Sequence, residues 1–359
     1  MKIAVLGSGN GGCAVAFDWA RMGHEVSLFD FEQFPATIAA VATAGGIEAE
    51  GELSGFAPVG YAGHDIGQAV GGADLVFAVG PAYSTQPFGE ACKPHLTEGQ
   101  TVVVCPSSCG GALVFKHAIG RDVGDDGIVV ADTSTLPYAV RITEPGKIHI
   151  FLRLSGGVWL AALPSARTGD VLVSVRRVYD YIEPATNVLQ TALQNGNPVI
   201  HPAVSLLNAA LIERTGGDFC FYEHGVTPAV GRLMESVDYE RIALGAELGV
   251  DVTPDPALGV QQGYMTEGTY HEGYAEAPGF KGIKAQESLD YRYFQEDVGY
   301  GMVFMAELGR QLAVPTPTMD ALIHLVSVVM QRDYRAEGVR TMATLGLDGY
   351  SADELRQIL

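Results

Sequence analysis

The sequence predicts an α/β domain with a doubly wound parallel sheet over residues 1–184, followed by an all-α domain over residues 185–359. Three observations support this prediction. A buried-strand run near the N-terminus leads directly into a glycine-rich turn. The first half of the chain alternates apolar strand-like runs with helix-like stretches. The region after Pro184 instead shows helical apolar periods and no strong strand pattern.

The glycine-rich turn indicates a dinucleotide site. Residues 3–12 read Ile-Ala-Val-Leu-Gly-Ser-Gly-Asn-Gly-Gly. In a Rossmann-type βα unit, Gly7 would permit the tight turn, Gly9 would let the backbone approach a pyrophosphate, and Gly12 would let the next helix pack on the strand. The diphosphate would lie at the positive end of that helix. A glycine turn in another kind of βα unit is the alternative. The predicted cofactor-binding residues of this turn are Gly7, Ser8, Gly9, Asn10 and Gly12.

The acidic residue Asp30 indicates which nicotinamide cofactor is used. It ends a second apolar run, Glu-Val-Ser-Leu-Phe-Asp, about 20 residues after the glycines. A carboxylate at this position accepts hydrogen bonds from the adenosine ribose and repels a 2′-phosphate. Residues 31–33 supply no Arg or Lys for such a phosphate. We therefore expect NAD rather than NADP. The alternative is that Asp30 only caps a turn.

The composition excludes several classes of partner. The formal net charge is −20, which argues against nucleic acid and against anionic membrane surfaces. An anionic substrate must then be bound by local cations. The chain has no apolar run of about 18 residues and no signal-peptide pattern, so we expect no membrane span and a cytoplasmic location. Five cysteines fit reduced thiols, and Cys105 and Cys109 lack the companions of a zinc site, so no metal is expected.

The first half contains six clear strand candidates. The alternation of these runs with helix-like stretches predicts parallel strands with crossover helices on both faces of the sheet. Two further runs, 158–163 and 171–175, are candidates to extend the same sheet. The six expected strands cover residues 2–6, 25–30, 74–79, 101–105, 128–132 and 149–152.

The second half reads as helical, with its clearest helices expected at residues 226–248, 298–312 and 318–330. Thr316 and Pro317 form a helix start, with Thr316 as the N-cap. Residues 351–354, Ser-Ala-Asp-Glu, form a capping box for a short terminal helix. Residues 263–284 are rich in Gly and Tyr and have no period, which predicts a long loop. Such a loop would either cover a substrate or pack on a partner subunit.

A dinucleotide fold does not name a reaction, so the helical half must supply a proton donor and a substrate anchor. The chain contains no lysine between Lys147 and Lys281, so the start of the helical half offers no lysine as the proton donor. His201, in Asn-Pro-Val-Ile-His-Pro, lies just past the expected domain junction and is the candidate donor. Pro202 is expected to start a helix over residues 203–212. The alternative for His201 is a structural histidine.

Residues 290–298, Asp-Tyr-Arg-Tyr-Phe-Gln-Glu-Asp-Val, form a second candidate element. On one helix, Arg292 and Glu296 would be i,i+4 neighbours, whereas Asp297 would point about 140° away from Arg292. Arg292 and Asp297 can flank one pocket only if a bend or helix end lies between them. A solvated charged helix is the alternative.

Four pieces of the sequence carry a resemblance to a known family: Gly7-x-Gly9-x-x-Gly12, the run Asp-Thr-Ser-Thr-Leu-Pro-Tyr at 132–138, residues 197–202 through Leu-Leu-Asn at 206–208, and Arg292-Tyr-x-x-Glu296-Asp297. With these pieces the chain resembles the NAD-dependent opine dehydrogenase family over nearly its whole length. One departure is Asp132, where relatives that act on arginine would be expected to have Glu. The departure favours an apolar amino acid over a basic one.

The resemblance implies a reaction in which a 2-oxo acid, usually pyruvate, condenses with the amino group of an amino acid and NADH reduces the imine. It implies that His201 is the general acid/base, that Asp297 orients it and stabilises the imidazolium, and that Arg292 binds a substrate carboxylate. Asn208 and Asp132 would join the substrate site. A 2-hydroxy-acid or hydroxy-phosphate dehydrogenase, and an NAD-binding protein without catalysis, are the alternatives. A homodimer formed through the helical half is also expected.

Overall fold

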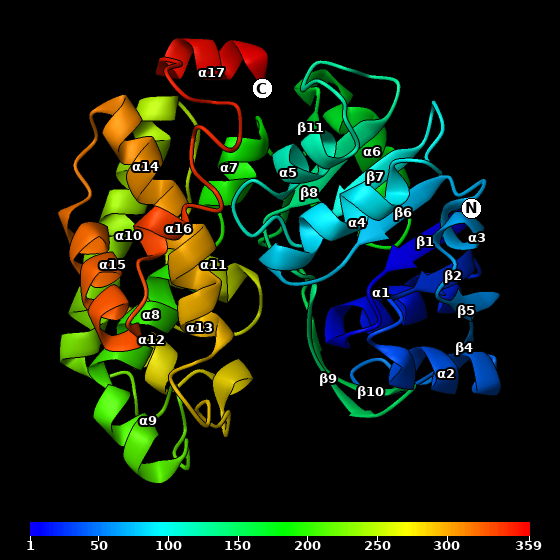
Figure 1. Ribbon diagram of the computed structural model, residues 1–359. Coiled ribbons are helices and arrows are strands. Elements are labelled where there is room, and N and C mark those ends of the chain that lie inside the picture. The colour runs from blue at the N-terminus through cyan, green and yellow to red at the C-terminus, as the bar shows by residue number, and fades with distance from the viewer. The chain divides into compact units, whose positions relative to one another are not determined.

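The computed structural model describes residues 1–359, which divide into two compact units. Unit 1 comprises Met1–Thr191 and Leu359, and unit 2 comprises Ala192–Ile358. The boundary lies inside helix α7 (Val188–Leu193), a few residues after the predicted change at 184/185. Unit 1 is a mainly parallel α/β sheet domain, and unit 2 is helical (Figure 1).

An eight-stranded sheet forms the centre of unit 1, in the order β12-β11-β8-β7-β6-β1-β2-β5. All neighbouring strands are parallel except β11, which runs antiparallel to β8. Strand β11 therefore extends the sheet as expected for residues 158–163, but in the opposite direction. The strands are β1 (Lys2–Leu6), β2 (Glu25–Phe29), β5 (Tyr61–Gly63), β6 (Leu75–Ala78), β7 (Thr101–Val104), β8 (Val129–Thr133), β11 (Trp159–Leu163) and β12 (Glu183–Pro184).

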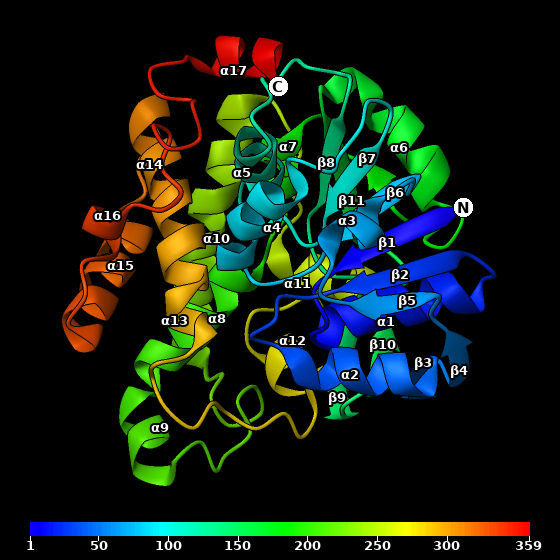
Figure 2. The ribbon, with the colours of Figure 1, turned by 45° about the vertical axis from the view of Figure 1, so that its right-hand side comes forward.

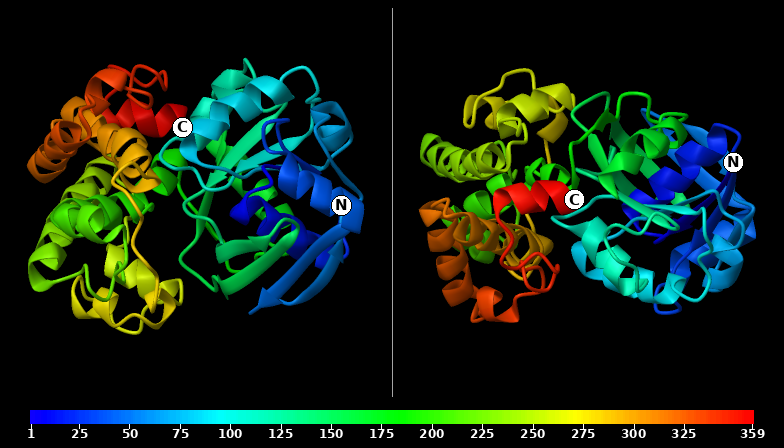
Figure 3. Two further views of the ribbon diagram at one scale, coloured as in Figure 1. Left: turned by 60° about the horizontal axis from the view of Figure 1, so that its bottom comes forward. Right: turned by 90° about the horizontal axis from the view of Figure 1, so that it is seen from above.

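The central strands are apolar on both sides because helices cover both faces of the sheet. Residues 3–6 of β1, for example, are all buried. Helices α4 and α5, in cyan, lie on one face, and α1 and α6 lie on the other, as right-handed crossovers require (Figure 3, right). The helices of unit 1 are α1 (Asn10–Arg21), α2 (Pro35–Ala44), α3 (Ile66–Val70), α4 (Thr85–Cys92), α5 (Gly111–Ala118) and α6 (Thr168–Val175).

A second, four-stranded sheet in the order β4-β3-β10-β9 packs on α1, which lies between the two sheets (Figure 3, left). The buried carboxylate of Asp18 on α1 accepts hydrogen bonds from Tyr138 Oη at 2.6 Å and from Arg153 Nε at 2.8 Å. The side chain of Asp18 therefore bonds helix α1 to two strands of the small sheet. The strands are β3 (Gly46–Gly51), β4 (Gly55–Pro58), β9 (Tyr138–Glu144) and β10 (Lys147–Arg153).

The strand predicted at residues 149–152 is confirmed as a strand but lies in the small sheet, and the strand predicted at residues 171–175 is wrong. Residues 149–152 belong to β10 of the small sheet, where one face of the strand is exposed and its side chains alternate between inside and outside. Residues 171–175 lie in helix α6, because the buried positions Thr168, Val171, Leu172 and Val175 follow a helical spacing despite the β-branched residues. The short strands between residues 46 and 63 were not predicted, since they are rich in Gly and Ala.

Unit 2 consists of helices, apart from one bridge between Cys220 and Lys284. The long helix α10 packs against α8, α14, α15 and α17. Figure 2 shows α17, in red, above the upper end of α10. None of the helices in the chain combines the length and the apolar character needed to cross a membrane. The helices are α8 (Asn197–Leu207), α9 (Ala209–Thr215), α10 (Pro228–Leu248), α11 (Asp255–Gln261), α12 (Glu272–Ala275), α13 (Arg292–Gln295), the π-helix Asp297–Met302, α14 (Val303–Leu312), α15 (Pro317–Met330), α16 (Tyr334–Glu337) and α17 (Ala352–Ile358).

The helices expected over 226–248 and 318–330 are confirmed as α10 and α15. The helix expected over 298–312 is a π-helix followed by α14, and the one expected over 203–212 is divided at Asn208 between α8 and α9. Thr316 is the N-cap residue of α15, and Ser351 and Glu354 exchange the hydrogen bonds of a capping box. Pro202 does not start a helix, because α8 already begins at Asn197 with a proline in its first turn. Pro202 therefore lies inside α8, directly after His201.

Candidate active site

The glycine turn of unit 1 leaves room for a ligand only at Gly9. Gly7 has a φ of +106°, and a Cβ atom there would lie 2.1 Å from the carbonyl oxygen of Val79. A Cβ atom on Gly12 would lie 1.8 Å from the carbonyl oxygen of Gly7. A Cβ atom on Gly9, the N-cap of α1, would meet nothing within 4 Å. Two glycines are thus required by packing, and the third faces open space beside a helix N-terminus, which fits the diphosphate of a dinucleotide.

Asp30 and Asn10 both hold the backbone near this turn. One carboxylate oxygen of Asp30, Oδ2, accepts hydrogen bonds from the backbone N–H and the hydroxyl of Ser8, each at 2.7 Å. The other, Oδ1, accepts the backbone N–H of Phe31 at 2.8 Å. The side-chain oxygen of Asn10 accepts the N–H of Ile142 from β9 at 2.7 Å. Asp30 therefore fixes the turn, and its carboxylate retains acceptor capacity for a ribose hydroxyl.

In unit 2, the structure brings His201 and Asp297 together. Nδ1 of His201, on α8, lies 2.7 Å from Oδ2 of Asp297, the first residue of the π-helix. Both side chains are buried. An ionised aspartate accepts a hydrogen bond from Nδ1–H, which fixes the tautomer and leaves Nε2 as the nitrogen that can exchange a proton with a ligand.

Aromatic side chains surround this imidazole. The ring of Tyr293 stacks on that of His201 with a centroid distance of 3.9 Å, and Phe221 lies at 6.1 Å. The hydroxyl of Tyr222 lies 3.3 Å from Nε2 of His201. Burial raises the pKa of Tyr222 well above its usual value, so the phenol stays protonated at neutral pH. None of these three aromatic residues was predicted, because an isolated aromatic residue carries no sequence signal for a neighbour distant in the chain.

Arg292 lies shortly before Asp297 in the sequence, and the type of helix changes between them. Helix α13 ends at Gln295 and the π-helix begins at Asp297, so a helix end lies between Arg292 and Asp297. The guanidinium of Arg292 lies 3.1 Å from a carboxylate oxygen of Glu296, and its side chain is about half exposed. Burial opposes the charge on Arg292, but Glu296 and Asp297 raise its pKa, so the cation is kept. A half-exposed guanidinium can bind a ligand carboxylate.

Two residues expected in the substrate site have other partners. Asp132 is fully buried on β8, and its carboxylate accepts hydrogen bonds from Ser107 Oγ at 2.6 Å, the N–H of Ala112 at 3.1 Å and Thr191 Oγ1 at 2.6 Å. The carboxylate of Asp132 therefore holds residues 107 and 112 in place, and a contact of Asp132 with substrate stays a prediction.

Asn208 joins two segments of unit 2. It lies between α8 and α9, and its amide nitrogen donates hydrogen bonds to the carbonyl oxygens of Val204 at 2.8 Å and Gly225 at 3.0 Å. Both amide hydrogens are used in this way, so a substrate could reach only the amide oxygen. The bonds fix the C-terminal end of the helix that carries His201.

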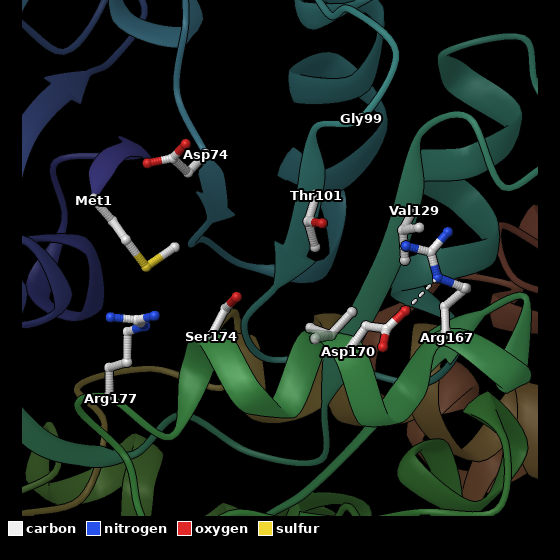
Figure 4. Close-up of a pocket in the computed structure, with 10 residues that line it drawn as sticks. Met1, Asp74, Gly99, Thr101, Val129, Arg167, Asp170, Ser174 and Arg177 are labelled. Atoms are coloured by element: carbon white, nitrogen blue, oxygen red, sulfur yellow. Dashed lines mark hydrogen bonds and ion pairs between the residues drawn. The ribbon is translucent and has the colours of Figure 1, made fainter.

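Unit 1 also has a hollow of about 410 Å³ at the opposite end of its sheet (Figure 4). Asp74, Thr101 and Val129 line it, and each lies where a parallel strand begins. The guanidinium of Arg167 at its rim is paired with Asp170 at 2.7 Å. Ligands of open α/β sheets bind at the carboxyl ends of the strands, so this hollow is not the expected cofactor site.

The comparisons with known proteins agree with the two units. Residues 184–330 match the family model described as NAD/NADP octopine/nopaline dehydrogenase, alpha-helical domain. The chain is 37% identical over 355 residues to an opine dehydrogenase of Arthrobacter sp. (strain 1C), which covers 98% of this chain and 97% of the relative. It is 25% identical to the protein ocs of Agrobacterium vitis, with 100% and 99% of the two chains covered.

Solved structures of octopine dehydrogenase share the fold. The structure described with NADH and L-arginine superposes with a TM-score of 0.80 and covers 99% of this chain and 97% of that one. The structure described with NADH and pyruvate gives a TM-score of 0.73, with 97% and 98% covered. Each is 18% identical to this chain, so the similarity concerns the fold.

Proposed function

Since this chain belongs to the opine dehydrogenase family of NAD(P)-dependent oxidoreductases, we propose that it condenses pyruvate with an apolar L-amino acid and reduces the product with NADH. The product would be an N-(1-carboxyethyl) amino acid, a secondary amine with two carboxylates. The activity would then be of the N-(1-D-carboxyethyl)-L-norvaline dehydrogenase type. The observation that carries the proposal is the buried pair of His201 and Asp297.

The dyad fits the proton transfers of this reaction. The overall reaction converts a 2-oxo acid, an amino acid in its ammonium form, NADH and one proton into the secondary amine in its ammonium form, NAD⁺ and water. The amino group must lose a proton before its nitrogen bonds to the carbonyl carbon, and the carbonyl oxygen must gain protons to leave as water. Nε2 of His201 would accept and return a proton, and Asp297 would stabilise the imidazolium.

The cofactor supplies the hydride that reduces the imine carbon. This chain's own residues would hold the cofactor at the glycine turn, with Gly9 beside the diphosphate and Asp30 toward the adenosine ribose. Relatives in the family use NAD or NADP, and solved octopine dehydrogenase structures are described with NADH. The carboxylate of Asp30 supports NADH for this chain.

Arg292 is the proposed anchor for a substrate carboxylate. A protein with a formal net charge of −20 does not attract anions through its overall field, so a local cation must do so. The planar guanidinium matches a carboxylate with two parallel hydrogen bonds. Both substrates carry a carboxylate, and we assign Arg292 to that of the 2-oxo acid.

An apolar partner amino acid is supported by the side chains around His201. Tyr222, Phe221 and Tyr293 present rings rather than charges near the imidazole. The nearby acid Glu296 is already paired with Arg292. Glu296 is therefore engaged by a cation of the protein itself, whereas an aliphatic side chain of the substrate could pack on the rings.

We further propose that the chain forms a homodimer through its helical unit. Helix α15 exposes three large aliphatic side chains, Leu325, Val328 and Val329, which a second copy could cover. Light scattering should then give twice the chain mass of 38.0 kDa. A mass of one chain at micromolar concentration would contradict the dimer.

An NADH-oxidation assay with each component omitted in turn tests the proposed function. The complete mixture contains NADH, pyruvate and one amino acid, which is varied from aliphatic to arginine. We expect NADH oxidation only when both substrates are present, and faster with aliphatic amino acids. Oxidation with pyruvate alone would indicate a 2-hydroxy-acid dehydrogenase and would contradict the proposal.

A further inference from the structure

The Gly- and Tyr-rich segment 263–284 packs inside unit 2. The hydroxyl of Tyr270 donates a hydrogen bond to Oδ2 of Asp238 at 2.6 Å, and that of Tyr274 donates to Asp255. These two bonds join the segment to α10 and to the first residue of α11. Two buried acidic side chains, Asp238 and Asp255, therefore fix the segment to the helices of unit 2.

The aromatic rings of this segment form a stack that ends at Tyr222. The ring of Phe280 lies 4.2 Å from that of Tyr222, 4.9 Å from that of Tyr264 and 5.7 Å from that of Tyr274, with interplanar angles of 15°, 17° and 3°. Near-parallel rings at these distances pack tightly, so each ring restricts the rotation of its neighbour. Phe280 therefore holds the ring of Tyr222 in one orientation.

The backbone next to Tyr222 is fixed by the same segment. The N–H of Phe221 donates to the carbonyl oxygen of Ile283 at 2.8 Å, and the N–H of Ala285 donates to that of Phe219 at 2.9 Å. These bonds flank the bridge between Cys220 and Lys284. Both the backbone and the ring of Tyr222 are thus positioned by residues 280–285, and its hydroxyl ends 3.3 Å from Nε2 of His201.

We propose that Tyr222 is a positioning residue for the acid–base histidine, and that the stack on Phe280 holds its hydroxyl at Nε2 of His201. The inference rests on the proposed function, since it assigns a role at the same dyad. It also gives the segment 263–284 a function, which is to orient the imidazole from the side opposite to Asp297.

A tyrosine hydroxyl suits this position because it can both donate and accept a hydrogen bond. When the imidazole of His201 is neutral, the hydroxyl of Tyr222 donates to Nε2. When the imidazole is protonated, Nε2–H donates to the oxygen of Tyr222. Until a substrate takes its place at Nε2, the hydroxyl therefore gives the buried nitrogen a partner in both states, and the ring keeps its orientation against Asp297. Tyr222 itself holds its proton throughout, since burial raises its pKa.

The first test removes the hydroxyl and keeps the ring. In Tyr222→Phe we expect kcat to fall about tenfold, the scale of one hydrogen bond to a charged group, with the dissociation constant of NADH unchanged. The control is Tyr239→Phe, which removes an exposed hydroxyl bonded to Glu235 on α10 and should leave kcat at the wild-type value. A wild-type kcat in Tyr222→Phe would overturn the inference.

The second test asks whether Phe280 acts through that hydroxyl. Phe280→Leu should lower kcat because Tyr222 loses its stacked ring, and Phe280→Tyr should restore most of it because the ring is kept. The double variant Tyr222→Phe/Phe280→Leu should have the kcat of Tyr222→Phe alone. Multiplying effects in the double variant would overturn the inference, because they would mean that Phe280 acts independently.

The activity of the wild type and of His201→Ala tests the proposed function independently of the role of Tyr222. If the wild type oxidises NADH only with both substrates and His201→Ala abolishes this activity, the proposed function holds whatever Tyr222 does. If the wild type shows no such activity, the proposed function fails and takes the role of Tyr222 with it.

Discussion

Nδ1 of His201 lies 2.7 Å from Oδ2 of Asp297, although 96 residues separate the two in the sequence. Helix α8 carries the histidine, and a π-helix that starts at the aspartate carries its partner. The type of helix changes at this aspartate, since α13 ends at Gln295 and the π-helix begins at Asp297.

The choice between NADH and NADPH should depend on Asp30. In Asp30→Ala combined with Glu32→Arg, the ratio of kcat/KM for NADH over NADPH should fall at least about tenfold, because repulsion of the 2′-phosphate is removed. Glu32→Arg alone is the matched control, since it adds the same cation and keeps the carboxylate of Asp30, and it should change the ratio less. Equal use of NADPH by the wild type would show that the role assigned to Asp30 is wrong.

Gly9→Ala and Gly12→Ala should separate cofactor binding from folding. A methyl group on Gly9 meets nothing within 4 Å, so this variant should keep the wild-type Tm and lose NADH affinity. A methyl group on Gly12 would lie 1.8 Å from the carbonyl oxygen of Gly7, so this variant should unfold at a lower temperature. Thermal unfolding and NADH titration provide the two readouts. Unchanged NADH affinity in Gly9→Ala would contradict the assigned diphosphate site.

Arg292→Gln should raise the KM for the 2-oxo acid by about tenfold or more, because a charge-assisted pair with the substrate carboxylate is lost. The KM of Arg292→Lys should lie between those of the wild type and Arg292→Gln, since lysine keeps the charge and loses the planar fork. Arg310→Gln is the control, because Arg310 is similarly exposed and is also paired with a glutamate, Glu307. A KM unaffected by Arg292→Gln would assign Arg292 to a purely structural pair.

Asp255 should make the stability of the protein depend on pH. Burial, followed by the nearby charge of Asp238, raises the pKa of Asp255 from 3.8 to about 7. Its stabilising contribution is therefore fully present below about pH 4 and is lost as the pH rises through about 7. Relative to wild type, Asp255→Asn should gain on the order of 2 kcal/mol in unfolding free energy between pH 5 and pH 8.

Urea unfolding at the two pH values measures this change. The exposed Asp348→Asn serves as the control and should show no such pH-dependent gain. If wild type and Asp255→Asn change in parallel between pH 5 and pH 8, the buried carboxyl of Asp255 does not bind a proton in this range.

The sequence was most informative where one residue type has one physical use. Gly7 and Gly12 lie where only glycine fits, and the capping box of Ser351 and Glu354 forms locally from four residues. Such features depend on near neighbours, so they can be predicted without the fold. The run 171–175 was predicted as a strand because its β-branched residues favour one. In the structure it is helix α6, which packs on β11 with buried residues at helical spacing.

Partners distant in the sequence could not be predicted in the same way. Resemblance to a family indicated His201 and Asp297, but Tyr222 carries no local pattern that predicts its contact with the imidazole. The partners of Asp132 could not be predicted for the same reason. A polar residue near the end of a strand can face a ligand or the interior, and the sequence does not predict the three hydrogen bonds that Asp132 accepts.

The most direct measurement is the steady-state kcat of His201→Ala, with NADH affinity measured in parallel. Loss of the general acid/base should lower kcat at least about a hundredfold, and NADH should bind as in the wild type. Asp297→Asn, which keeps the shape of the partner and removes its charge, should also be impaired. A His201→Ala variant that turns over like the wild type would contradict the central claim that this histidine exchanges the proton.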